Sequence, residues 1–92
     1  MKVNFYATYR PIVGGKTVDF DVDHGIRVHQ LVDAIITRFP AMRREMLDEN
    51  SQLYSHVHIF VNGRDVCYLE KGMDTIILAD DTLNIFPPVG GG

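Results

Sequence analysis

The sequence contains a single cysteine, Cys67, among its 92 residues, and this scarcity excludes an internal disulfide bond. No apolar run approaches the length of a membrane span, and no secretory leader opens the chain, so we expect a cytoplasmic protein without a membrane partner. Positive charge is also scarce, because 9 Lys and Arg side chains stand against 12 Asp and Glu, for a net charge of -3. Phosphate binding requires a basic stripe, so we do not expect nucleic acid as a partner.

The residues that are present form the composition of one folded domain. Hydrophobic residues make up 46% of the chain and charged residues 23%, as in ordinary folded proteins and unlike disordered ones. The chain is small but long enough to bury a core. We expect residues 1–86 to form this domain and residues 87–92 to form an extended tail.

The N-terminal part of the sequence predicts a hairpin followed by a helix. Apolar and polar residues alternate over 2–9 and again over 17–22, on either side of a loop at 10–15. Over 28–39 the apolar residues recur with the spacing of one helix face, until Pro40 ends the pattern. The residues expected to face the core are Val3, Phe5, Ala7, Val18, Phe20, Val22, Val28, Leu31, Val32, Ile35, Ile36 and Phe39.

The C-terminal part predicts a short helix and further strands. Segment 41–55 holds a second helical piece whose apolar side consists of Met42, Met46 and Leu47. Strand 57–61 runs into Asn62-Gly63, a strong hairpin turn signal, after which 66–69 returns and 83–86 forms the last strand. One long helix is thus available to cover one face of the sheet, which predicts an α+β fold.

The chain ends in an unusual run, Pro87-Pro88-Val89-Gly90-Gly91-Gly92. Residues without side chains at a terminus cannot pack into a core or cap a helix, and they lose much backbone entropy when ordered. The prolines fix φ near about −65° and keep the base of the run extended. At roughly 3.3–3.6 Å per residue, we expect 87–92 to reach about 20 Å, so that the Gly92 carboxylate can enter a narrow pocket of another protein. The simpler alternative is a frayed, solvated terminus.

Several residues together resemble the pattern of a known family. They are the tail with Ile85 and Phe86 before it, Asp81 just before the last strand, Arg10 at the end of the first strand, and the turn Val61-Asn62-Gly63. With the order of elements, they resemble the MoaD/ThiS family of ubiquitin-like sulfur carriers over the whole chain. This resemblance implies a β-grasp (ubiquitin-like) fold, in which a mixed β-sheet packs on one main α-helix. The long segment 41–55 is similar to that of the archaeal MoaD-like small modifiers.

Three positions depart from the family pattern. Gly90 stands where alanine is usual, Asp80 stands where glycine is usual, and Arg27 stands where a helix-capping threonine is expected.

The resemblance also implies a chemistry for the tail. An E1-like partner enzyme, using ATP and Mg²⁺, adenylates the Gly92 carboxylate, and a sulfur donor then converts it to a thiocarboxylate. The chain itself is expected to bind no cofactor and to be a substrate rather than an enzyme. The sulfur would pass to a molybdopterin synthase large subunit or another acceptor, whereas the alternative fate is an isopeptide bond to lysines of target proteins. A third, different class is a plain binding module that uses only the face of the sheet.

The strand pattern predicts where partners bind. If Val57, Ile59 and Val61 face the helix, then Phe60 points to the outer face of the sheet, and by the same alternation so do Tyr6 and Phe86. We expect these three rings to form an exposed patch, with Arg10 as a polar contact at its rim. The alternative is that segment 41–55 folds over the rings.

A metal or nucleophilic site has weaker support. His56 and His58 would share a strand face, and a two-residue turn would place Cys67 opposite His58, but no fourth ligand is apparent, so we expect no metal. No residue pattern supplies a base for Cys67 as a nucleophile, and we expect it to be a small buried apolar residue.

Overall fold

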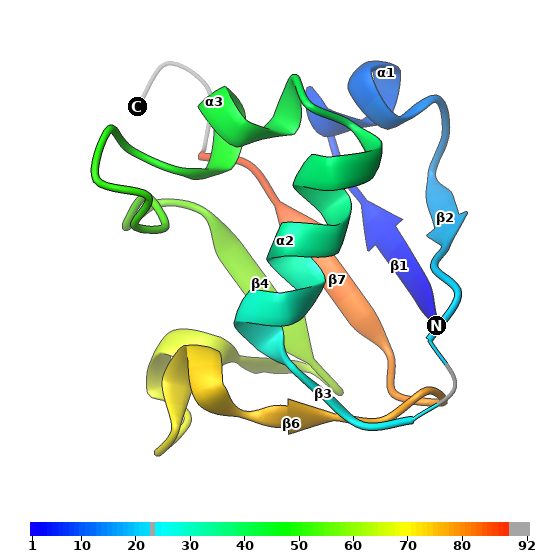
Figure 1. Ribbon diagram of the computed structural model, residues 1–92, viewed down its shortest axis with the longest axis vertical. Helices are drawn as coiled ribbons and strands as arrows, with labels where there is room; N and C mark the ends of the chain where they lie inside the picture. The colour runs from blue at the N-terminus through cyan, green and yellow to red at the C-terminus, as the bar shows by residue number, and fades with distance from the viewer. Residues whose placement is uncertain (23, 89–92) are drawn as a thin grey trace.

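The computed structural model describes residues 1–22 and 24–88 (Figure 1). Five strands form one sheet, and in chain order they are β1 (Lys2–Phe5), β2 (Thr17–Asp19), β4 (His58–Val61), β5 (Arg64–Asp65) and β7 (Leu83–Phe86). A separate two-stranded sheet pairs β3 (Ile26–Arg27) with β6 (Ile76–Ile77). The helices are α1 (Tyr9–Val13), α2 (Val28–Arg38) and α3 (Met42–Met46), with 3-10 helices η1 (Val66–Tyr68) and η2 (Gly72–Asp74).

The larger sheet has the strand order β2-β1-β7-β4-β5 and is mixed. β1 and β7 run parallel at its centre, whereas β1 pairs with β2, and β4 with both β5 and β7, in antiparallel fashion. Figure 1 shows α2 lying across one face of this sheet. The predicted α+β architecture, a mixed sheet with one main helix, is therefore confirmed.

The core lies between α2 and the sheet. The helix buries Val28, Leu31, Val32 and Ile35, the spacing that the sequence predicts, and it ends just before Pro40. From the sheet, alternate residues of β1, β4 and β7 complete the core, because successive side chains of a strand point to opposite faces. These residues are Val3, Phe5, Ile59, Val61, Leu83 and Ile85.

The first strand is shorter than predicted. It ends at Phe5, and the chain then enters α1, so the prediction that Ala7 faces the core and that Arg10 ends the strand is wrong. Ala7 is exposed and adopts a left-handed φ of 50°, which turns the chain. The turn buries Tyr9, whose hydroxyl donates to the Glu45 carbonyl at 3.3 Å. The burial of this large ring against α3 is the physical reason why the chain turns away from the strand after Phe5.

The return strand after Asn62-Gly63 is also shorter than predicted. Both turn residues have positive φ, 52° and 82°, as a two-residue hairpin turn requires, but β5 ends at Asp65 and η1 follows. The Asp65 carboxylate accepts the Cys67 backbone N–H at 3.1 Å, a local cap that competes with the strand ladder. Cys67 is consequently exposed and lies outside the ladder, so the predictions that it is buried and opposite His58 are wrong.

The structure also accounts for two departures from the family pattern. At the start of α2, the Arg27 backbone N–H donates to Gln30 Oε1 at 2.8 Å, and the Val28 N–H donates to the Thr75 carbonyl at 3.0 Å. Before β7, the Asp81 carboxylate accepts the Leu78 N–H at 2.7 Å. Among the described residues other than glycine, Ala7, Ser51 and Asn62 have positive φ, so Asp80 occupies a conformation that does not call for glycine.

Candidate functional site

Four residues gather on the face of the sheet opposite α2, where β7 ends, and we call them the outer-face cluster: Tyr6, Arg10, Phe60 and Phe86. Phe60 and Phe86 alternate with the buried residues Ile59 and Ile85 along β4 and β7. All four are partly exposed, and none is part of the core. The structure thus brings together the four residues that the sequence predicts as a partner-binding patch, while their binding role stays a prediction.

The rings of the outer-face cluster are in direct contact. Tyr6 and Phe86 are stacked, with centroids 4.1 Å apart and an interplanar angle of 14°. Phe60 meets Phe86 edge to face, at 5.5 Å and 85°. Each such contact contributes about 0.5–1.5 kcal/mol beyond the burial of its area. The three aromatic side chains therefore form one surface of fixed shape.

Arg10 is held at the edge of this surface. Its guanidinium carbon lies 5.2 Å from the centroid of the Tyr6 ring, within cation–π range. Its Nε donates to the Phe5 carbonyl at 2.9 Å. Because α1 replaces the end of the predicted strand, Arg10 reaches the ring from a helix, and its positive charge has a defined position at the rim.

A row of polar side chains crosses β2, β1 and β7 on the same face. Asn84 Oδ1 accepts the Tyr6 hydroxyl at 2.9 Å and the Asn4 amide at 3.0 Å, and Asn4 Oδ1 accepts the Thr17 hydroxyl at 2.7 Å. This row orients the Tyr6 ring. Asn4, Thr17 and Asn84 are not among the residues singled out from the sequence, although the alternation that places Tyr6 outside also places Asn4 and Asn84 there.

The outer-face cluster lies where the tail begins. Phe86 is the last residue of β7, and Pro87, half-buried, and Pro88, exposed, follow it outside any strand. The other predicted tail residues, Val89, Gly90, Gly91 and Gly92, lie outside the described residues. A partner that binds the three rings would therefore contact the protein directly beside the point where the tail starts.

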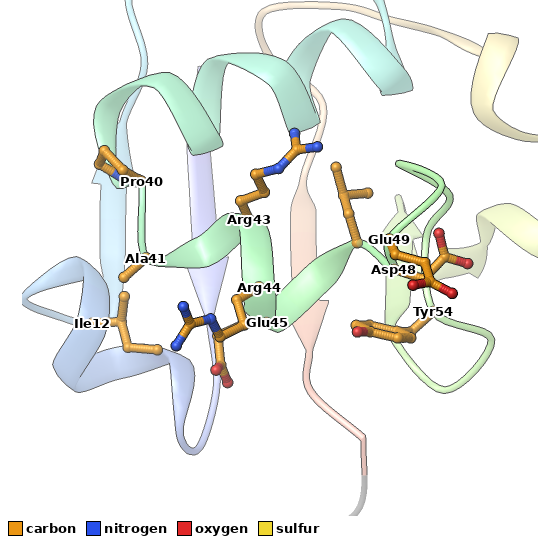
Figure 2. A pocket seen from close by; sticks show the side chains of 10 residues that line it. Ile12, Pro40, Ala41, Arg43, Arg44, Glu45, Asp48, Glu49 and Tyr54 are labelled. Carbon is orange, nitrogen blue, oxygen red and sulfur yellow. The ribbon is translucent and has the colours of Figure 1, made fainter.

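A shallow hollow beside these rings is lined by residues of β4, β5, η1 and β7, and none of its lining residues belongs to segment 41–55. α3 buries Met42 and Met46 in the core and packs against α2. A different hollow lies between α1 on one side and α3 with the loop that follows α3 on the other. Figure 2 shows the side chains that line this hollow, among them Ile12, Arg44 and Tyr54. Charges of both signs line it, from Arg43 and Arg44 to Glu45, Asp48 and Glu49, so it offers no uniform surface for a partner.

The candidate metal ligands do not assemble. His56 lies in an exposed turn before β4 rather than on the strand, so the prediction that it shares a face with His58 is wrong. His58 Nδ1 instead contacts Asp65 Oδ2 at 2.8 Å. Among residues 1–22 and 24–88, no group of three or more His, Cys, Asp or Glu side chains could hold a metal ion.

Cys67 is a poor candidate nucleophile. The neighbouring Asp65 carboxylate, which the thiol contacts by a hydrogen bond, raises the pKa of Cys67. The thiolate is the reactive form, so a raised pKa lowers the reactivity of this side chain.

The described helices are too short to cross a membrane. α2, with 11 residues, is the longest of them, and no described helix combines the length and the apolar character that crossing a membrane requires.

The fold and the site together define a class. A mixed sheet packed on one main helix is the β-grasp architecture of ubiquitin-like carriers and modifiers. The family model of the ThiS family matches residues 3–92, so the chain belongs to this family. Its members are small carrier proteins and not catalysts, and the chain is accordingly not an enzyme.

Two relatives are similar over most of this chain. Small archaeal modifier protein 3 of Haloferax volcanii is 30% identical over 92 residues, which cover 100% of this chain and 98% of that protein. A putative sulfur carrier protein of Archaeoglobus fulgidus is 34% identical over 76 residues, covering 80% of this chain and 84% of that protein.

Two solved structures have the same fold. The crystal structure of SAMP1 from Haloferax volcanii matches with a TM-score of 0.81 and 32% identity, over 100% of this chain and 98% of that one. A putative molybdopterin converting factor, subunit 1, from Pyrococcus furiosus matches with a TM-score of 0.74 and 29% identity, over 96% and 95%. The β-grasp prediction is confirmed.

Proposed function

We propose that the chain is a ubiquitin-like sulfur carrier whose Gly92 carboxylate is adenylated by an E1-like enzyme and then converted to a thiocarboxylate. The observation that carries this proposal is the position of the outer-face cluster. Phe86, which stacks on Tyr6, is followed directly by Pro87-Pro88 and then by the glycine run. Docking on the rings therefore delivers the end of the chain to the partner.

The proposed activation answers a chemical need. A free α-carboxyl group has a pKa of about 3.3–3.7, so at neutral pH it is an anion and a poor electrophile. In the proposed step, a Gly92 carboxylate oxygen attacks the α-phosphorus of ATP, and pyrophosphate leaves with Mg²⁺. A sulfur nucleophile then attacks the acyl carbon and AMP leaves. If the nucleophile is hydrosulfide, loss of its remaining proton leaves the thiocarboxylate on Gly92. If it is the terminal sulfur of a persulfide, a thiol cleaves the S–S bond of the resulting acyl disulfide and forms a disulfide with the donor, which leaves the same thiocarboxylate.

The tail sequence suits this step. Gly91 and Gly92 have no Cβ, so their backbone can approach a nucleotide phosphate closely. Pro87 and Pro88 restrict φ and lower the entropy that the tail loses when it enters a pocket. The catalytic groups, ATP and Mg²⁺ all belong to the E1-like partner, and this chain supplies the docking surface and the reacting carboxylate.

We further propose that the sulfur is used in molybdopterin synthesis, with a molybdopterin synthase large subunit as the acceptor. Support comes from the fold shared with the molybdopterin converting factor subunit of Pyrococcus furiosus and from the similarity to a putative sulfur carrier. In cells that lack this large subunit, the thiocarboxylate form of the chain is expected to accumulate. Its absence there would remove molybdopterin as the recipient.

The activation step has a direct test in pyrophosphate exchange. Purified E1-like enzyme from the same genome, incubated with the chain, ATP and labelled pyrophosphate, should form labelled ATP only when the chain is present. A variant lacking Gly92 should lose this stimulation while keeping its folded spectrum. If that variant stimulates exchange as well as the intact chain does, activation at Gly92 is wrong and a plain binding module becomes the better account.

Conjugation to proteins is the second candidate function. It is supported by the similarity to small archaeal modifier protein 3, which extends over the whole chain. The activated Gly92 would then be attacked by a lysine Nζ, and an isopeptide bond would form as the activating group leaves. A ladder of higher-mass species that carry a glycine remnant on lysine, and that disappear when Gly92 is deleted, would establish this fate.

A further inference from the structure

A shallow hollow adjoins the outer-face cluster and is lined by His58, Phe60, Asp65, Tyr68 and Phe86. Phe60 and Phe86 belong to both features, so the hollow continues the proposed docking surface. Tyr68, on η1, is 86% exposed. A large ring this exposed adds little to the stability of the core, and beside a cluster of partly exposed rings it indicates a binding surface.

A negative charge lies at the side of this hollow. The Asp65 side chain is 10% exposed, and its oxygens accept the Cys67 N–H at 3.1 Å and contact His58 Nδ1 at 2.8 Å. Burial alone raises the pKa of Asp65, but the hydrogen bonds from Cys67 and His58 outweigh burial and leave this pKa below its ordinary value. The carboxylate is therefore ionised at neutral pH.

The ionised carboxylate determines how His58 presents its ring. A carboxylate accepts hydrogen bonds and cannot donate them, so the proton between the two groups belongs to Nδ1 of His58. In the neutral ring this leaves Nε2 as an acceptor. The structure gives Nε2 no partner among the residues it describes, and the His58 side chain is 41% exposed. The hollow thus offers aromatic walls, a negative charge and a free acceptor.

We propose that this hollow binds an arginine side chain of the protein that docks on the outer-face cluster. The inference rests on the proposed function, because it assigns one contact of that same docking. A guanidinium group stacks on aromatic rings such as Tyr68 and Phe60, donates to an acceptor such as His58 Nε2, and is attracted by the Asp65 charge. Lysine carries the charge but lacks the planar group that stacks on rings.

The hollow and Arg10 place opposite charges at the two ends of the aromatic surface. Arg10 lies over Tyr6, Tyr6 stacks on Phe86, and Phe86 contacts Phe60 beside His58 and Asp65. Charges arranged in this way select one orientation of a partner. We therefore expect the partner to present an acidic residue to Arg10 and the arginine to the hollow.

The test is an NMR titration of the full chain with N-acetyl-arginine amide. The matched probe is N-acetyl-citrulline amide, which has nearly the same shape and no charge. The arginine probe should shift the ring signals of His58 and Tyr68 in a saturable manner, and citrulline should bind roughly two- to fivefold more weakly, as a cation–π contact predicts. Equal binding of both probes, or shifts confined to other surfaces, would overturn the proposal.

Variants separate the charge from the shape of the hollow. Asp65→Asn should reduce the preference for arginine over citrulline, because it removes the negative charge and leaves the aromatic rings in place, whereas Asp33→Asn, on the exposed side of α2, should leave the preference unchanged. If Asp65→Asn does not fold, Tyr68→Ala is the second variant, since its exposed ring can be removed without opening the core. If the variant that folds prefers arginine as strongly as the unchanged chain does, the assignment is refuted. The titration needs no E1-like enzyme or ATP, so its failure leaves the pyrophosphate-exchange test of Gly92 unaffected.

Discussion

Tyr6 and Phe86 stack with their ring centroids 4.1 Å apart, although 80 positions separate them in the chain. Tyr6 follows β1 and Phe86 ends β7, and these two strands form the parallel pair at the centre of the sheet. The contact therefore joins the place where the chain leaves β1 to the place where the tail leaves β7. An aromatic surface built in this way is rigid at the base of the tail.

Truncating the rings should weaken docking without unfolding the protein. Phe60→Ala and Phe86→Ala are each expected to weaken binding to the E1-like enzyme by about 1–3 kcal/mol, because central aromatic residues dominate binding free energy. Isothermal titration calorimetry measures this change. Ile85→Ala is the control for loss of a core side chain, since Ile85 is fully buried. The free energy of unfolding of this variant should fall by about 2–5 kcal/mol. If Phe86→Ala unfolds the protein but leaves affinity intact in the folded fraction, the ring belongs to the core.

Removing the Tyr6 hydroxyl should affect stability more than binding. Tyr6→Phe deletes the hydrogen bond to Asn84 Oδ1 but keeps the stacked ring. We expect the free energy of unfolding to fall by about 0.5–1.5 kcal/mol, measured by urea denaturation. Affinity for the E1-like enzyme should stay close to that of the unchanged chain. A large loss of affinity would instead mean that the hydroxyl itself contacts the partner.

The His58–Asp65 contact should make stability depend on pH in the acidic range. Because the pKa of Asp65 is lower in the folded protein, its carboxylate stabilises the fold above the ordinary aspartate pKa, and this contribution is lost as the pH falls through the folded pKa. Asp65→Asn should therefore be less stable than the unchanged chain at neutral pH, with a difference that shrinks on acidification. Urea denaturation at several pH values tests this, and a difference independent of pH would contradict it.

The hairpin turn after β4 should require glycine at one position. Gly63 has a φ of 82°, and although a Cβ there would meet nothing within 4 Å, a side chain strains this backbone conformation. We expect Gly63→Ala to lower the free energy of unfolding by about 1 kcal/mol. Gly15→Ala is the matched control, because Gly15 has equally open space and no positive φ. Equal effects of the two substitutions in thermal denaturation would show that backbone strain is not the cause.

Periodicity was sufficient to predict the parts of the site that lie on regular strands. Phe60 and Phe86 alternate with buried aliphatic residues, so a spacing of two positions placed both rings on the outer face. The same rule indicated Tyr6. The core face of α2 followed from the 3.6-residue period, because eleven residues are long enough for the pattern to be clear.

The residues that sequence reasoning misplaced depend on contacts between distant segments. Tyr9 is buried because α3 covers it, and its partner Glu45 is 36 positions away, so the alternation of 2–9 seemed to continue past Phe5. The Asp65 carboxylate caps η1 and contacts His58, and this side-chain bond ends the strand before Cys67. The local spacing of apolar residues does not predict such side-chain bonds. Tyr68 was missed for the same reason, since a strand over 66–69 left its exposure unseen.

The central claim is that Gly92 is the reacting residue, and intact mass spectrometry tests it most directly. The chain is incubated with its E1-like enzyme, ATP, Mg²⁺ and a sulfur donor, and the product is then fragmented. We expect one exchange of oxygen for sulfur, located on Gly92 and absent when ATP is omitted or when a residue is appended after Gly92. A sulfur modification located on Cys67 instead, or one that persists after Gly92 is deleted, would contradict the account.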